Sequence, residues 1–289
     1  MKTSNHLLRR LTAALLAAVL ALSIALPVFA SDDGDTIYIN SVSDLLSLAR
    51  SCAYDQWSVG KTVILQKDLS LEGMLWEPIP SFSGQFKGNG HTISDLTITG
   101  QYSPAGLFGI VEEQGSIESL SVRGVVSVSD SADTTTGGIA GINHGTLISC
   151  QFTGVVTGDS EVGGIVGRNE SEGTIDHGTA RAIVTGKSST GGIAGYNLGA
   201  ITGCTNVGSI NTEYPEASLD TDGFTAKMVD YINNKMAAAA DDATNSVTNV
   251  ATDTGGIAGR SSGMILTSVN TGTIGYEHVG LSLIHISEP

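Results

Sequence analysis

The chain has 289 residues with 14 basic and 29 acidic side chains, which gives a formal net charge of −15. Such a surface has no basic patch to neutralise phosphates, so the composition argues against nucleic acids and anionic membranes as partners. It suits basic or neutral glycans better, and divalent cations weakly.

Residues 1–30 are predicted to be a signal peptide. A basic start is followed by an apolar stretch over residues 11–26, and Val28-Phe29-Ala30 fits the small-x-small cleavage rule. The alternative is an N-terminal membrane anchor, but the apolar run is short for one. Cleavage removes three basic residues and no acidic ones, so the net charge becomes −18. We therefore expect a secreted protein, without a membrane span in the mature chain.

Residues 31–81 are predicted to form an N-terminal cap and the first strands. Strands are expected at Thr36–Asn40 and Lys61–Gln66. Between them, Ser41 or Ser43 can cap a short helix over residues 44–50. A solenoid needs such a cover, because its end exposes unpaired strand edges.

Residues 82–280 are dominated by one short repeated phrase. The copies open at Gly137, Gly163, Gly191 and Gly255 with the pattern Gly-Gly-Ile-(Ala/Val)-Gly, and a looser copy begins at Ala105. Each phrase is followed, in one register, by a glycine, an aliphatic residue and a run of alternating β-branched residues. Repetition of this kind is the signature of a solenoid, in which each coil buries its apolar side against the next.

One copy reads as short strands joined by tight turns, and it is shorter than the roughly 30 residues of a βαβ unit. The sequence therefore predicts an all-β fold, a right-handed parallel β-helix. Equivalent aliphatic residues should then stack into inward columns. One predicted column contains Ile139, Ile165, Ile193 and Ile257; a second contains Val126, Val156, Val184, Ile210 and Ile274.

These phrases resemble the GLUG-motif repeats of secreted bacterial surface proteins, over about residues 82–280. The run from Phe82 to Ile93 is similar to the segment that precedes the repeats in that family. The resemblance implies a place among large adhesins or beside peptidase domains, including the IgA-specific metallopeptidases. It is specific for the architecture and much less so for the function.

The segment 213–253 interrupts the glycine pattern. Phe224, Met228, Tyr231/Ile232 and Met236 follow helical spacing, so one helical insertion is predicted. It is either a helix packed on the outside of the coils or an arm that grips a partner.

Residues 281–289 break the register and resemble the translation of a sequencing-library transposon end. We expect them to be non-native and the repeat to continue beyond Gly280. The alternative is a natural divergent cap.

The three cysteines are expected to be unpaired. Cys150 and Cys204 hold the same coil position with the Gly178 coil between them, so coils spaced ~4.8 Å apart place them ~10 Å apart. This exceeds the ~7 Å limit for a disulfide. Cys52 lies in a different segment.

No residue is assigned to catalysis, to a cofactor or to a metal, because neither a His-Glu-x-x-His nor a Gly-x-Ser-x-Gly pattern is present. Two other sets stand out. One is a predicted structural ladder of stacked turn residues, Asn143, Asn169 and Asn197. The other is a predicted outward strip for sugar or peptide contact, Arg168, Tyr196 and Arg260. Scattered surface residues are the alternative interpretation of the strip.

The function expected from these features is that of a secreted or cell-surface, non-catalytic, adhesin-type solenoid that contacts a glycan or a protein. Two alternatives stay open. One is a carbohydrate-active β-helix enzyme, which the scarcity of charge in the repeats weakens. The other is an accessory region of a larger surface peptidase, which the family resemblance allows.

Overall fold

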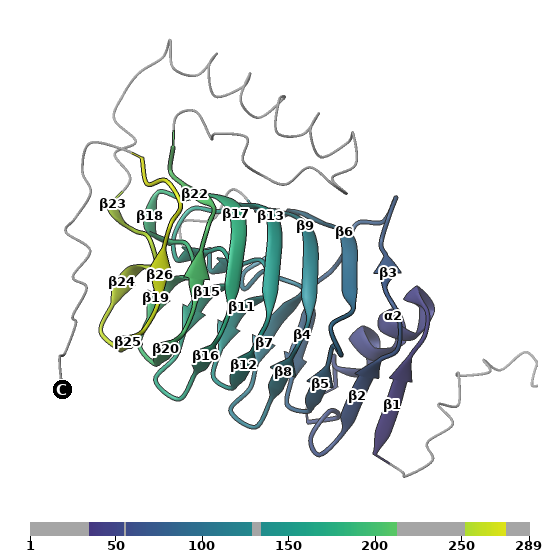
Figure 1. Cartoon of the computed structure of the whole chain (residues 1–289). Helices are drawn as coiled ribbons and strands as arrows, with labels where there is room; N and C mark the ends of the chain where they lie inside the picture. Colours follow the sequence, from purple (N-terminus) through teal and green to yellow (C-terminus); the bar gives the residue numbers. More distant parts are fainter. Residues whose placement is uncertain (1–34, 55, 129–133, 213–251, 276–289) are drawn as a thin grey trace, which may run out of the picture. The chain divides into compact units, whose positions relative to one another are not determined.

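The computed structural model describes residues 35–54, 56–128, 134–212 and 252–275. Its strands form a solenoid of about six turns, in which every strand pairs in parallel with the equivalent strand of the next turn (Figure 1). The predicted parallel β-helix is confirmed. In the described part of the chain, no helix has the length and apolar character needed to span a bilayer.

Two sheets contain eight strands each, and in sheet B one of the eight lies off the main path. Sheet A is ordered β1 (Thr36–Ile39), β2 (Thr62–Leu65), β5 (Gln85–Lys87), β8 (Ser116–Glu118), β12 (Thr146–Ile148), β16 (Thr174–Asp176), β20 (Ala200–Thr202), β25 (Met264–Leu266). Sheet B is ordered β3 (Leu69–Ser70), β6 (Thr92–Gly100), β9 (Ser121–Val128), β13 (Gln151–Thr157), β17 (Thr179–Thr185), β21 (Thr205–Asn206), β26 (Val269–Asn270), and β22 (Ser209–Ile210) also pairs with β17.

The other two sheets come from the glycine phrases. Sheet C is ordered β4 (Ile79–Phe82), β7 (Phe108–Val111), β11 (Ala140–Asn143), β15 (Val166–Asn169), β19 (Ala194–Asn197), β24 (Ala258–Ser261). Sheet D is ordered β10 (Thr136–Gly137), β14 (Val162–Gly163), β18 (Ser188–Gly191), β23 (Thr252–Gly255).

The core consists of stacked columns, as the repeat register predicts. In sheet B, Val126, Val156 and Val184 are cross-strand partners and are fully buried. Ile139, Ile165 and Ile193 are also fully buried, and they are stacked by backbone hydrogen bonds: the N–H of Ile139 donates to the carbonyl of Ile165, and the N–H of Ile165 to that of Ile193. Burying one such side chain contributes on the order of 1.5–3 kcal/mol. Both predicted columns are confirmed in these coils, whereas Ile257 and Ile274 of the last described coil are half-buried.

Helix α2 (Val42–Ser51) lies at the N-terminal end and packs against β1 and β4 (Figure 1). Ser41 is its N-cap, because its side-chain oxygen accepts a hydrogen bond from the backbone N–H of Asp44. Leu45 and Leu48 are completely buried. The predicted short helix and its two flanking strands are thus confirmed.

The glycines of the repeated phrase let backbone pack directly on backbone. A Cβ atom on Gly167 of sheet C would lie 2.5 Å from the backbone nitrogen of Thr136 in sheet D. A Cβ atom on Gly138 would overlap the ring of Phe152. Any larger residue at these positions has to displace a neighbour, which explains the fixed glycine spacing.

Other predictions concern residues outside the described part of the chain. They are the signal peptide at 1–30, most of the insertion 213–253 and the non-native segment 281–289. The division between a cap at 31–81 and a solenoid from 82 stays a prediction. The first strands, β1 to β4, lie in the same sheets as the later ones.

Candidate functional site

The three strip residues occupy one outward column of sheet C. Arg168 of β15 pairs in register with Tyr196 of β19, and Tyr196 pairs with Arg260 of β24. The next residues in β15 and β19, Asn169 and Asn197, are completely buried. Because side chains alternate along a strand, the strip lies on the outer face of the sheet.

Both arginines contact the tyrosine ring. The guanidinium carbon lies 5.2 Å from the centroid of the Tyr196 ring for Arg168 and 5.1 Å for Arg260. Since β19 lies between β15 and β24, the two cations approach the ring from opposite sides. Each cation–π contact of this kind is worth roughly 0.5–1 kcal/mol at an exposed site. The flat faces of the ring are therefore already occupied by the protein.

Arg168 is also held by two carboxylates. Its Nη1 lies 2.9 Å from Oε1 of Glu161, and its Nε lies 2.7 Å from Oε1 of Glu170. Glu161 is fixed in turn, because its other oxygen accepts a hydrogen bond from the hydroxyl of Thr135 at 3.1 Å. The charge of Arg168 is thus compensated. Arg260 is exposed and has no carboxylate partner among the described residues.

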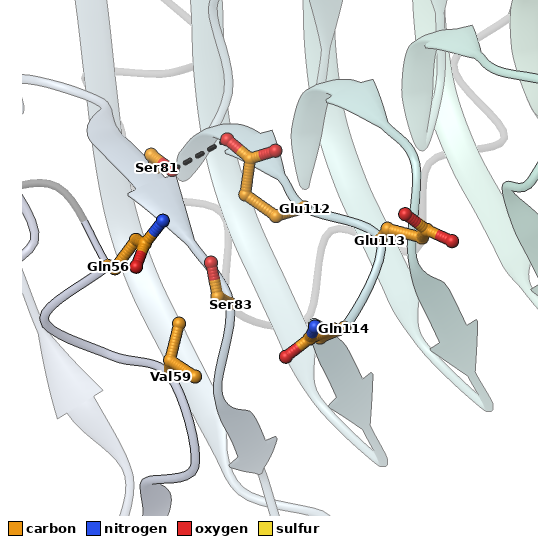
Figure 2. Close-up of a pocket in the computed structure, with 7 residues that line it drawn as sticks. All are labelled: Gln56, Val59, Ser81, Ser83, Glu112, Glu113 and Gln114. Carbon is orange, nitrogen blue, oxygen red and sulfur yellow. Dashed lines mark hydrogen bonds between the residues drawn. The ribbon is translucent and has the colours of Figure 1, made fainter.

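The same column continues to a hollow toward the N-terminal end. Ile142, Ile110 and Ser81 follow in register and are half-buried. Ser81 lines a cavity of about 430 Å³, and its hydroxyl donates to Oε1 of Glu112 at 2.7 Å (Figure 2). Figure 2 shows Glu113 pointing away from Glu112, so the two carboxylates do not converge on one point. This hollow could not be predicted from the sequence, because its lining comes from three segments far apart in the chain.

The asparagine ladder residues lie on the inner side of sheet C and are completely buried. Asn143 donates from Nδ2 to Oδ1 of Asn169, and Asn169 donates in the same way to Asn197, both at 2.8 Å. Asn197 donates to the hydroxyl of Ser261 at 3.2 Å. Each amide also donates to a backbone carbonyl two to four residues ahead, such as that of Gly145, which fixes its orientation. Hydrogen bonds thus link four successive coils along the axis.

A second asparagine row was missed. Asn206 of sheet B donates from Nδ2 to Oδ1 of Asn270 at 2.7 Å, and Asn206 is completely buried. Asn211 similarly donates to the hydroxyl of Thr254 at 3.0 Å. The signal was present, because Asn206 and Asn270 occupy equivalent positions in the repeat.

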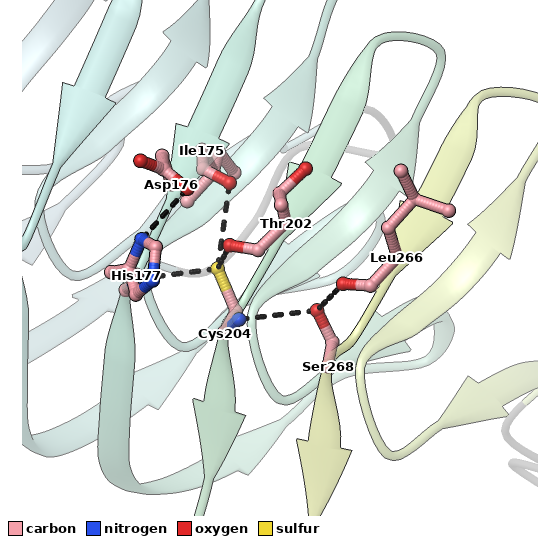
Figure 3. A network of polar contacts seen from close by, with 8 residues as sticks. Ile175, Asp176, His177, Thr202, Cys204, Leu266 and Ser268 are labelled. Atoms are coloured by element: carbon pink, nitrogen blue, oxygen red, sulfur yellow. Dashed lines mark hydrogen bonds and ion pairs between the residues drawn. The ribbon is translucent and has the colours of Figure 1, made fainter.

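The cysteines are free and buried, as expected. Cys204 accepts a hydrogen bond from the backbone N–H of Gly178 at 3.2 Å, and its thiol lies 3.4 Å from the carbonyl oxygen of Thr202 (Figure 3). Burial raises the pKa of the Cys204 thiol to about 11 and that of Cys150 to about 12. Both are therefore neutral thiols at physiological pH, which are poor nucleophiles.

Two of the described histidines contact a nearby aspartate. Nδ1 of His177 lies 2.8 Å from Oδ1 of Asp176 next to the Cys204 network, and Nδ1 of His91 lies 3.0 Å from Oδ1 of Asp68. The hydrogen bonds from the Thr92 backbone and from His91 keep the pKa of the Asp68 carboxyl below its usual value. Within the described ranges, no cluster of three or more His, Cys, Asp or Glu side chains could hold a metal ion.

Comparison with known proteins gives partial matches. No family model matches the chain. Halomucin of Haloquadratum walsbyi is 31% identical over 155 residues, which is 49% of this chain but 2% of Halomucin. A protein of Evansella cellulosilytica named "Putative Gly-rich membrane protein" is 29% identical over 137 residues, which is 34% of this chain and 16% of that protein. The chain thus spans only a small part of the length of these relatives.

A solved structure shares the fold. The crystal structure of "a putative immunoglobulin A1 protease from Bacteroides ovatus" matches with a TM-score of 0.57 and 18% identity. The match covers 84% of this chain and 68% of that one. At this level of identity the likeness shows a common solenoid architecture.

Proposed function

We propose that the chain is a non-catalytic binding module of the cell exterior that contacts an acidic group of a glycan through Arg260. The net negative charge disfavours polyanions over the rest of the surface, so the proposed contact is confined to this strip. The observation that carries the proposal is the Arg168–Tyr196–Arg260 strip on the outer face of sheet C. Its geometry favours hydrogen bonds from a guanidinium group over stacking of a sugar ring on the tyrosine. Sugar rings commonly bind proteins by lying on aromatic faces, but both faces of Tyr196 are covered by guanidinium groups. The strip therefore offers charged hydrogen-bond donors.

The division of roles within the strip follows from charge compensation. Arg168, held by Glu161 and Glu170, positions one side of the tyrosine ring. Arg260, exposed and without a described carboxylate partner, is the donor left for a ligand. A guanidinium forms paired hydrogen bonds with carboxylate or sulfate groups. An acidic polysaccharide carries such groups.

The location outside the cell is supported by the predicted signal peptide and by the name of one partial relative, Halomucin. Charged residues are scarce in the repeats, which supports the proposal that the repeats carry no catalytic site. A long stack of identical coils supplies a stiff support for a binding surface.

The test is a binding measurement with polygalacturonate as the anionic probe and dextran as the neutral one. We expect the chain to bind polygalacturonate at low ionic strength and to release it as salt is raised, because exposed charges are screened. Arg260→Gln should weaken binding about five- to tenfold. The matched control is Arg181→Gln, since Arg181 is an exposed arginine on β17 of sheet B.

Several results would contradict the proposal. Equal binding of polygalacturonate and dextran would show that charge does not determine binding. Equal losses of affinity in Arg260→Gln and Arg181→Gln would show that the strip is not the binding site. Preference for poly-glutamate over polygalacturonate would assign the strip to a protein partner. Release of reducing ends from the polysaccharide would favour the enzyme alternative.

A second candidate, an accessory region of a larger surface peptidase, is favoured by the solenoid shared with the Bacteroides ovatus protein. Its test is the gene sequence downstream of codon 280. A peptidase domain in the same reading frame would support it.

A further inference from the structure

The hollow beside Ser81 lies between two walls of the N-terminal coils (Figure 2). One wall is the turn between β7 and β8, which covers residues 112–115. The other wall comes from the chain between α2 and β2, through Gln56 and Val59. The turn between β4 and β5 has only two residues, and its Ser83 lies between the walls. A long turn next to a short one thus leaves an open space on the surface.

Backbone hydrogen bonds hold these walls in place. The N–H of Ser83 donates to the hydroxyl of Ser58 at 2.9 Å, which ties the short turn to the chain between α2 and β2. The N–H of Glu112 donates to the carbonyl oxygen of Phe82, and the N–H of Gly115 donates to that of Glu112. A site whose walls are fixed before the ligand arrives loses less conformational entropy on binding.

Glu112 has a carboxylate whose charge is not compensated. In the turn after β15, Glu170 occupies the same position and pairs with Arg168 at 2.7 Å. The position of Arg168 is occupied in β7 by Ile110, which carries no charge. Glu112 accepts a hydrogen bond only from the neutral hydroxyl of Ser81, and among the described residues no Lys, Arg or His forms an ion pair with it.

The rest of the lining is mostly neutral and polar. The side chains of Gln56, Ser83 and Gln114 form no hydrogen bond with another residue in the described ranges. Amides and hydroxyls both donate and accept hydrogen bonds. Val59 is the apolar member of the lining, and no cationic side chain belongs to it.

We propose that this hollow binds a protonated amino sugar. Its ammonium group donates to the carboxylate of Glu112, and its ring hydroxyls exchange hydrogen bonds with Gln56, Ser83 and Gln114. Hydrogen bonds between an ammonium and a carboxylate are about twice as strong as neutral ones. The volume of about 430 Å³ lies in the range of roughly 300–1,000 Å³ that small-ligand sites occupy. The net charge of −15 also attracts cationic ligands.

Two other cationic ligands fit the hollow less well. A divalent cation needs several oxygen ligands around one point, but Glu113 points away from Glu112. A lysine side chain carries its ammonium group on an apolar four-carbon stem, for which only Val59 offers an apolar contact. A sugar ring carries hydroxyls in place of that stem, and these match the amides and hydroxyls of the lining.

The site is separate from the contact proposed for Arg260. The hollow lies beside β4 and β7 of sheet C, whereas the strip lies on β15, β19 and β24, and β11 lies between the two. The two proposals therefore involve different residues and ligands of opposite charge, so that either can fail without the other.

The experiment is calorimetric titration of the full chain with a β-1,4-linked glucosamine trimer and, as the neutral counterpart, with the N-acetylglucosamine trimer. We expect the glucosamine trimer to bind and the acetylated one to bind at least about tenfold more weakly, because acetylation removes the charge. Binding of the glucosamine trimer should be lost as the pH rises and its ammonium groups lose their protons.

Glu112→Gln tests the carboxylate. The amide oxygen of glutamine can still accept from Ser81, so the wall keeps its shape, and affinity for the glucosamine trimer should fall at least about fivefold. Gln114→Ala should lower the same affinity about two- to fivefold through the lost hydroxyl contacts. The matched control is Glu172→Gln, which removes one exposed charge from the four-residue turn after β15 and should bind like the unmodified chain.

The proposal is overturned by the absence of binding at millimolar glucosamine trimer or by equal affinity for the two trimers. Equal losses in Glu112→Gln and Glu172→Gln would overturn it as well, because they would show that only the overall charge matters. Trilysine serves as the peptide probe. If it binds as tightly as the glucosamine trimer and with the same dependence on Glu112, the hollow accepts basic peptides and the assignment to a sugar is wrong.

Discussion

The buried asparagine row begins with an acceptor oxygen that has no hydrogen-bond donor. Oδ1 of Asn143 is buried and has no hydrogen-bond partner. The reason is the previous coil, in which the paired residue is Val111 and cannot donate. At the other end of the row, Ser261 accepts the last hydrogen bond with its hydroxyl. An unsatisfied buried acceptor costs about 1–3 kcal/mol.

Substituting Val111→Thr should therefore be unusually well tolerated. The new hydroxyl has nearly the volume of the lost methyl group and can donate to Oδ1 of Asn143. At an ordinary core position the same change buries an unsatisfied hydroxyl and costs about 1–3 kcal/mol. Val122→Thr is the matched control, because its column neighbours are the apolar Ile93 and Phe152. Urea unfolding should show Val111→Thr to be more stable than Val122→Thr by about 1–3 kcal/mol; equal losses would refute this account.

At the scale of elements, each glycine phrase lies where two strands come into close contact with each other and with the sheet across the core. Gly138 shows this directly, since a Cβ atom there would overlap the Phe152 ring of sheet B. Gly138→Ala should destabilise the fold by about 1–3 kcal/mol through overpacking. Phe152→Leu opens space at this contact, so the same alanine should cost at least about 0.5 kcal/mol less in that background.

Gly109→Ala is the control for this cycle. Its Cβ atom would meet Pro80 O at 3.1 Å and no atom of Phe152 among its three nearest contacts. Its cost, measured by thermal or urea unfolding, should be the same with and without Phe152→Leu. Coupling of equal size at both glycines would mean that Phe152→Leu loosens the whole stack.

The elements that could be predicted from the sequence are those that depend on register. The Val126 and Ile139 columns follow from the common register of the copies, because equivalent residues of stacked coils must meet. Sheet D could not be predicted. Its strand at Thr136–Gly137 has two residues and reads as a turn. The pairing of Arg168 with Glu161 and Glu170 was also missed, since it depends on how the two turns beside β15 fold back.

At the scale of the whole molecule, a stack of coils is held together mainly by contacts between neighbours, so its stability varies along the axis. Among the described strands, those of the middle coils pair on two sides, whereas β24, β25 and β26 pair on one side. Local opening in proteins ranges from almost no free energy at frayed ends to the global unfolding free energy in the core.

Native-state hydrogen exchange should resolve this gradient. Amides of β13 and β17 should exchange most slowly, and those of β25 and β26 should exchange fastest among the described strands. Protection should fall coil by coil from β17 toward the last described coil. Equal protection in all coils would show that the chain opens only as one cooperative unit.

The asparagine rows also give the molecule a dipole along the solenoid axis. Every bridging amide in them, from Asn143 to Asn197 and at Asn206, donates toward the C-terminal end. Backbone dipoles in sheets largely cancel, but these side-chain dipoles point the same way and add. The row therefore begins with an unpaired oxygen at Asn143 and ends at the Ser261 hydroxyl, which accepts the last amide hydrogen. Each extra winding that carries asparagine would lengthen this aligned series, so the polarity of the solenoid axis grows with the number of repeats.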